Sequence, residues 1–67
     1  MTNTLKLKSA MEKSGLSQEL IAELLGISSR VLEAKVNGDR EFKASEIRKL
    51  YDVLNLTNQS VMEIFFQ

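Results

Sequence analysis

Hydrophobic positions in this chain recur at helical spacing in five short segments. In the first, residues 4–14, Leu7, Ala10 and Met11 stand at i, i+3 and i+4, the spacing of one helix face. The other segments are residues 18–25, 28–37, 44–54 and a short one from about residue 58. Their apolar stripes are Ile21, Ala22, Leu24 and Leu25, then Leu32 and Val36, then Ile47, Leu50, Tyr51 and Leu54, and finally Val61, Ile64 and Phe65. Strand-like alternation of useful length is missing, so the pattern predicts an all-α, five-helix single domain over residues 1–67.

Polar residues at the segment boundaries support these helices, because a Ser, Thr or Asn side chain can accept a free backbone N–H at a helix start. The predicted N-cap residues are Ser17, Ser28 and Thr57, with Thr2, Asn3 and Thr4 competing for this role at the first helix. The first and third segments are followed by glycines, Gly15 and Gly38, which suit the left-handed residue that ends a helix.

Lys43 occupies the N-cap position of the fourth helix and breaks this rule. A lysine there is about 1 kcal/mol less favourable than a serine. Glu46 follows three residues later, where a capping box places its acidic residue. Two explanations remain open: the Lys43 side chain points at a phosphate, or Ser45 or water supplies the cap.

Residues 17–38 form the stretch around which the rest of the chain is arranged. Gly26 permits a sharp corner between two helices, Ile27 follows as an apolar plug, and the small Ala22 lies where the helices would cross. Two short helices that meet at a Gly-containing turn are typical of a helix-turn-helix. An ordinary helical hairpin is the alternative, but the spacing of Ala22 and Gly26 is what close crossing requires.

Composition narrows the class of protein. Cys and His are both absent, which excludes disulfides, thiolate zinc sites and nucleophile–histidine catalysis. A Gly-rich phosphate loop after a strand is not found, and the carboxylates fall mainly on solvent-facing helix positions, so we expect no enzyme, no cofactor and no metal. No apolar run approaches the roughly 18 residues of a membrane span, and the N-terminus has no signal-peptide core, so we expect a cytoplasmic protein without membrane contact.

The charge balance is unusual for a protein that binds nucleic acid. Nine Lys and Arg residues oppose nine Asp and Glu residues, whereas nucleic-acid-binding domains are usually basic. Basic side chains only slightly outnumber acidic ones in residues 28–43. That stretch contains Arg30, Lys35, Arg40 and Lys43 against Glu33, Asp39 and Glu41.

The segment LSQELIAELLGIS at residues 16–28, followed by Asn37–Gly38, resembles the phage-repressor family of helix-turn-helix proteins, the Cro/CI or XRE type. The stretch NGDREFKASEI and the terminal EIFF are similar to a branch of short prophage regulators. The resemblance extends from Leu5 to Phe66. It implies a lambda-repressor-like fold and a sequence-specific, DNA-binding transcriptional regulator whose recognition helix, about residues 28–37, enters the major groove.

The resemblance also implies which residues contact DNA. Ser29, Arg30 and Ala34 match positions that face base edges, and Glu33 lies beside them. Arg30 would contribute most to selectivity, because a guanidinium can bind both acceptors of a guanine; the alternative is that Arg30 faces solvent or a phosphate. The residues expected at the DNA backbone are Gln18, Ser28, Asn37 and Lys43.

Lys35 departs from the family pattern, which usually has an apolar residue at this position. Either the end of the third helix is rotated, or Lys35 lays its stem on the core and keeps its ammonium in water.

The expected partners are an operator duplex, and a second copy of the chain that contacts it through Phe65 and Phe66. Paired exposed aromatics on a small domain usually meet a partner; the alternative is that both rings close the core. A second function is also open, in which a protein-interaction module of the same fold binds a repressor and modulates it. The balanced net charge and the apolar C-terminus favour that function.

Overall fold

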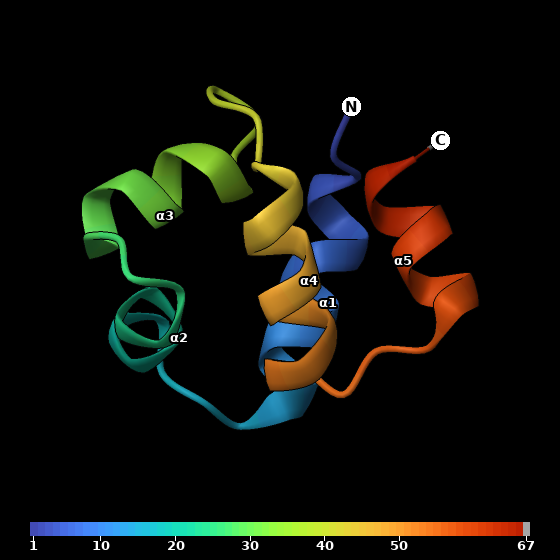
Figure 1. Cartoon of the computed structure of the whole chain (residues 1–67), viewed down its shortest axis with the longest axis horizontal. Coiled ribbons are helices and arrows are strands. Elements are labelled where there is room, and N and C mark those ends of the chain that lie inside the picture. The colour runs from blue at the N-terminus through green and yellow to red at the C-terminus, as the bar shows by residue number, and fades with distance from the viewer. Residues whose placement is uncertain (67) are drawn as a thin grey trace.

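The computed structural model describes residues 1–66, and over this range the chain is all-helical (Figure 1). The helices are α1 Thr4–Ser14, α2 Gln18–Leu25, α3 Ser29–Val36, α4 Ala44–Val53 and α5 Asn58–Phe65. The five predicted helices are therefore confirmed. Three ends differ by one residue from the predicted segments, because Ser28 is the N-cap of α3 and Asn37 and Leu54 are the C-caps of α3 and α4, so all three lie outside the helices.

The helix starts follow the predicted capping chemistry. Ser17 Oγ accepts the N–H of Leu20, and Ser28 Oγ accepts the N–H of Val31, each at 3.1 Å. Thr57 caps α5 in the same way through the N–H of Ser60. Among the three candidates at the first helix, the structure selects Asn3, whose side chain accepts from Lys6.

A single hydrophobic core joins the five helices. Its buried members are Leu7, Ile21, Ala22, Leu25, Leu32, Val36, Phe42, Leu50, Leu54, Ile64 and Phe65. Four other stripe residues, Ala10, Met11, Ile47 and Val61, are partly buried and pack against this core. Two expected stripe positions are exposed instead: Leu24 is 47% exposed and Tyr51 is 37% exposed. Each of these two residues extends the apolar face of its helix beyond the part that packs on the core.

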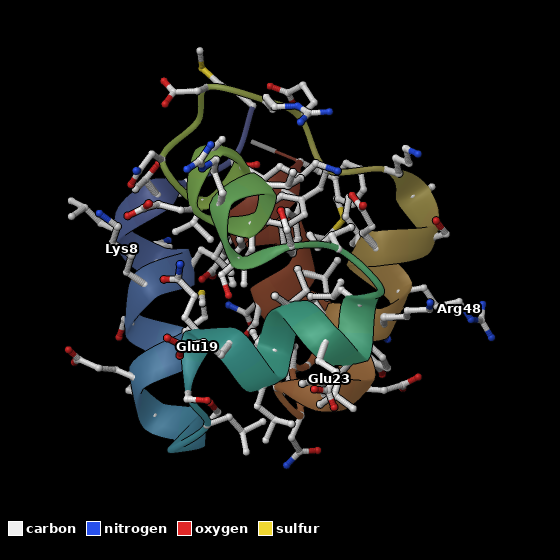
Figure 2. All side chains as sticks on the ribbon, turned by 90° about the vertical axis from the view of Figure 1, so that its left-hand side faces the viewer. Lys8, Glu19, Glu23 and Arg48 are labelled. Carbon is white, nitrogen blue, oxygen red and sulfur yellow. The ribbon has the colours of Figure 1, made fainter. Side chains whose placement is uncertain are left out.

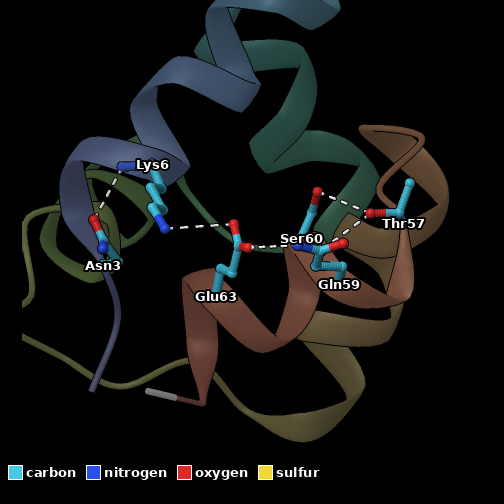
Figure 3. A network of polar contacts seen from close by, with 6 residues as sticks. All are labelled: Asn3, Lys6, Thr57, Gln59, Ser60 and Glu63. Carbon is cyan, nitrogen blue, oxygen red and sulfur yellow. Dashed lines mark hydrogen bonds and ion pairs between the residues drawn. The ribbon is translucent and has the colours of Figure 1, made fainter.

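The helices are arranged so that α3 lies at one end of the molecule and α5 at the other (Figure 1). Helix α2 packs against α3 and α4, while α1 packs against α3 and α5. The backbone N–H of Asn3 donates to the carbonyl of Ile64 at 2.6 Å, which ties the N-terminal segment to α5. Exposed polar contacts continue this junction, with Lys6 Nζ 3.4 Å from Glu63 Oε1 and Gln59 donating to the same carboxylate (Figure 3).

The two C-terminal aromatics have different environments. Phe65 is buried and packs edge-to-face on Phe42, with ring centroids 5.5 Å apart. Phe66 is 58% exposed. The prediction of Phe65 as a contact to a second copy is therefore wrong, because its ring closes the core of its own chain, and Phe66 alone stays available for such a contact.

Among the described residues, the structure contains no helix with the length and apolar character needed to cross a membrane.

Candidate nucleic-acid interface

A tight turn joins α2 to α3. Gly26 has φ of 77°, and its N–H donates to Glu23 O, while the N–H of Ile27 reaches back to Ala22 O at 3.0 Å. This pair of bonds ends a helix with a left-handed residue, which glycine adopts without strain. Ala22 is buried beneath the turn, so the two helices are close where they meet.

Gln18 links the starts of the two helices. This half-buried first residue of α2 donates from Nε2 to the carbonyl of Ser29, the first residue of α3, at 3.5 Å. The contact is long for a hydrogen bond, so it contributes little stability. It does orient the Gln18 side chain toward the start of α3. Gln18 thus lies beside the N-terminus of α3, and its contact with the DNA backbone stays a prediction.

Helix α3 has one buried and one exposed face. Leu32, Lys35 and Val36 are buried. Arg30, Glu33 and Asn37 are exposed, and their spacing of three and four residues places them in one stripe along the helix. We call these three residues the outer stripe.

The other residues predicted to contact DNA differ in their exposure and in their place in the fold. Ser29 and Ala34 are half-buried, so they offer less surface than Arg30 and Glu33 do. Ser28 is exposed, and its hydroxyl oxygen is already used to cap α3. Lys43 is exposed but lies outside α3, at the start of α4.

Helix α1 contributes to this region through a groove that sequence reasoning missed. Lys8 and Glu12 line it together with Gln18, Glu33 and Asn37. Figure 2 shows Lys8 on one side of α2 and Arg48 on the other, with Glu19 and Glu23 on the helix between them. The sequence gives no sign that Lys8, and not the other lysines of α1, borders α3.

Lys43 has an exposed side chain that makes no capping hydrogen bond. Its backbone N–H donates to Glu46 Oε1 at 2.8 Å, which is the acidic half of the predicted capping box. Neither explanation offered for Lys43 is decided by this contact, since the ammonium group is free to meet a phosphate or water.

On the buried side of α3, Lys35 forms an ion pair with Glu46 of α4. Lys35 Nζ lies 2.7 and 2.8 Å from the two carboxylate oxygens of Glu46, and the residues are only 3% and 5% exposed. The explanation that keeps the Lys35 ammonium in water is therefore wrong, because a carboxylate meets it inside the protein. The expectation that carboxylates face solvent also fails at Glu46.

The partners of Glu46 control its ionisation. Burial raises the pKa of this carboxyl, but the hydrogen bonds from Lys35 and from the Lys43 N–H, together with the positive charge of Lys35, outweigh burial and lower the pKa below its ordinary value. Glu46 is therefore ionised at neutral pH, and Lys35 contributes no free positive charge to the surface.

Without Lys35, the exposed charge around α3 is balanced. Over residues 28–43 and the α1 wall of the groove, the exposed basic side chains are Lys8, Arg30, Arg40 and Lys43, and the exposed acidic ones are Glu12, Glu33, Asp39 and Glu41. The weak basic bias predicted for this region is thus removed, and any affinity for a polyanion has to come from the placement of single cations.

The fold and this surface define a small all-helical protein in which a short helix, held by a tight glycine turn, presents a polar stripe to solvent. A family model described as "Protein of unknown function (DUF739)" matches residues 4–67, and the chain belongs to this family. Searches of curated proteins and of solved structures found no match to the chain.

Proposed function

We propose that this protein is a sequence-specific DNA-binding transcriptional regulator of phage or prophage type, with α2 and α3 as a lambda-repressor-like helix-turn-helix. The observation that supports it is the outer stripe, which stands free on a short helix whose opposite face is buried and whose start is fixed by the Gly26 turn. A helix can enter the major groove only when a partner helix braces it from behind in this way.

In this proposal α3 lies in the major groove and Arg30 reads a base. The guanidinium is exposed at the first turn of α3, and bidentate binding to guanine gives about 1–3 kcal/mol of discrimination. Glu33, on the same stripe, can accept a hydrogen bond from a cytosine amino group. Ser29 and Ala34 contribute smaller contacts, the latter to a thymine methyl.

Phosphate contacts come from the edges of the surface. The sequence resemblance assigns these phosphate contacts to Gln18, Ser28, Asn37 and Lys43. Lys8, which lines the groove beside α3, is a further candidate. These contacts place the helix on the duplex without reading its sequence.

One such unit covers one half-site, and two units on one face of a duplex lie about 34 Å apart. Phe66 is the contact we assign to the second copy, because it is the more exposed of the terminal aromatics.

A titration of duplex DNA tests the proposal. We expect fluorescence anisotropy to detect binding to a random-sequence duplex at low salt, with affinity falling as salt rises. Lys8→Ala should weaken this binding and reduce its salt dependence. Lys13→Ala removes the same charge from α1 but on a different groove, bordered by α5, so it should have little effect. Absence of binding at low salt, where phosphate contacts are strongest, would contradict the proposal.

The second candidate function is a protein-interaction module that binds and modulates a repressor. It is favoured by the balanced charge around α3 and by Leu20 and Leu24, which are exposed four residues apart on α2. We expect Leu20→Ser with Leu24→Ser to abolish association with a purified repressor if this function holds, and to leave DNA affinity unchanged if the first one does.

A further inference from the structure

The ion pair between Lys35 and Glu46 joins the last turn of α3 to the first turn of α4. Within residues 1–66 these are the two charged side chains that are fully buried. Glu46 Oε1 also accepts the Lys43 N–H, so one carboxylate holds both the side chain from α3 and the backbone at the start of α4. The pair therefore connects two helices that are separated by the loop of residues 37–43.

Stability alone does not account for this pair. Lys and Glu are among the residues least often buried, and replacing a buried ion pair by apolar residues of similar volume is often neutral or stabilising. Lys35 shares the buried residues of α3 with Leu32 and Val36, and Glu46 shares those of α4 with Leu50, so apolar replacements such as Met and Leu suit these helix faces.

What the pair adds is a fixed orientation of α3 relative to α4. Apolar side chains keep their contact energy when two helices slide or rotate slightly, whereas charged hydrogen bonds need short distances and alignment. The two bonds of Lys35 Nζ, at 2.7 and 2.8 Å, allow little such movement. Lys35 lies between Glu33 and Asn37 in the sequence of α3, so a rotation that breaks the pair also turns the outer stripe.

We propose that Lys35 and Glu46 are positioning residues that fix the direction of α3 relative to α4, and thereby make the outer stripe selective for one arrangement of bases. The second half of this inference rests on the proposed function, while the first half does not depend on DNA.

Residual dipolar couplings test the first half. In the wild-type protein one alignment tensor should fit the amides of all five helices, α1 to α5, together. In the Lys35→Met, Glu46→Leu double variant the couplings of α3 should deviate from the tensor that fits the other helices, while the midpoint of thermal unfolding is the same or higher. The Lys43 N–H freed by Glu46→Leu lies at an exposed residue, where water can accept it.

The matched control is the Lys6→Met, Glu63→Leu double variant, which makes the same replacements in the exposed pair between α1 and α5. One tensor should still fit all its helices. If α3 of the buried-pair variant fits the common tensor as well as it does in the wild type, the inference is wrong. Should that variant not fold, Lys35→Met with Glu46→Gln keeps an acceptor for the Lys43 N–H and is measured in its place, with the same two outcomes.

DNA selectivity tests the second half. For the double variant Lys35→Met, Glu46→Leu, we expect the ratio of affinities for a selected site and a random duplex to fall at least tenfold, with non-specific affinity unchanged. An unchanged ratio would overturn the link to selectivity. If the wild-type protein binds no DNA, the proposed function fails, and the dipolar couplings still decide whether the pair positions α3.

Discussion

The α3–α4 junction and the α1–α5 junction each contain a lysine–glutamate pair, but the two pairs lie in different environments. Lys35 and Glu46 are enclosed, with two bonds no longer than 2.8 Å. Lys6 and Glu63 meet once at 3.4 Å on the surface, with side chains 47% and 38% exposed (Figure 3). The α1–α5 junction has other support, since the backbone N–H of Asn3, the N-cap of α1, donates to the carbonyl of Ile64 in α5.

The difference shows that an ion pair's role depends on what surrounds it. Water screens the charges of an exposed pair, and such pairs contribute little to stability. A buried pair is a strong constraint, because each charge depends on the other for solvation. In this protein the constraint lies beneath α3, the helix that we propose to enter DNA.

The largest expected effect comes from removing one member of the buried pair. Lys35→Met leaves the Glu46 carboxylate buried without a cation, which should lower the free energy of unfolding by about 3–5 kcal/mol. Because domains have only about 0.05–0.15 kcal/mol of stability per residue, this change brings a chain of this length close to unfolding. Lys6→Met should leave the midpoint of urea unfolding nearly unchanged. Equal shifts for the two variants would contradict the contrast between the junctions.

The two glutamates should also differ in how much they make the stability of the fold depend on pH. The pKa of Glu46 is lowered in the folded protein, so this group stabilises the fold above its unfolded pKa, and this stabilisation is lost as pH falls through its lower folded pKa. The stability lost in Glu46→Gln should therefore be largest at neutral pH and shrink below about pH 4.3, the ordinary glutamate pKa. Urea unfolding measured at several pH values gives this difference.

Glu63 provides the control for the acid experiment. Hydrogen bonds from Gln59 and Lys6 also lower the pKa of this carboxyl, but the pair is open to solvent. The stability of Glu63→Gln should stay close to that of the wild type at every pH. A pH-dependent difference as large as that of Glu46→Gln would remove the distinction.

The smallest effect concerns the cap of α4. Lys43→Ser supplies the side-chain oxygen that this N-cap lacks, and should raise the free energy of unfolding by about 0.5–1 kcal/mol. Under the proposed function the same change weakens DNA binding without altering sequence preference. Lys49→Ser, in the interior of α4, is the matched control: it removes one exposed lysine but creates no cap, so it should not stabilise the protein. A gain in Lys49→Ser equal to that in Lys43→Ser would contradict the capping argument.

Features that depend on neighbouring residues could be predicted from the sequence. The caps at Ser17, Ser28 and Thr57 and the left-handed glycines at residues 15 and 38 are formed within one turn of helix, so the local sequence contains all the chemistry involved. The helix boundaries followed from these positions.

Features that depend on helices meeting in space could not be predicted. Lys35 shares the buried face of α3 with Leu32 and Val36, which could have signalled that it is enclosed, but nothing local identifies Glu46 as its partner. Phe65 and Phe66 are adjacent in sequence, and only the packing of α5 decides which ring is buried.

Loss of sequence preference in Arg30→Ala is the most direct test of the proposed role of α3. After selection of bound sites from a random DNA pool, the affinities for a selected and a random duplex are compared in Arg30→Ala and in Arg48→Ala. Arg48 is also exposed, but it lies on α4 in the groove toward α5. We expect Arg30→Ala to remove about 1–3 kcal/mol of preference for the selected site and to keep random-duplex affinity close to that of Arg48→Ala. Retention of the full preference in Arg30→Ala would contradict readout by this residue.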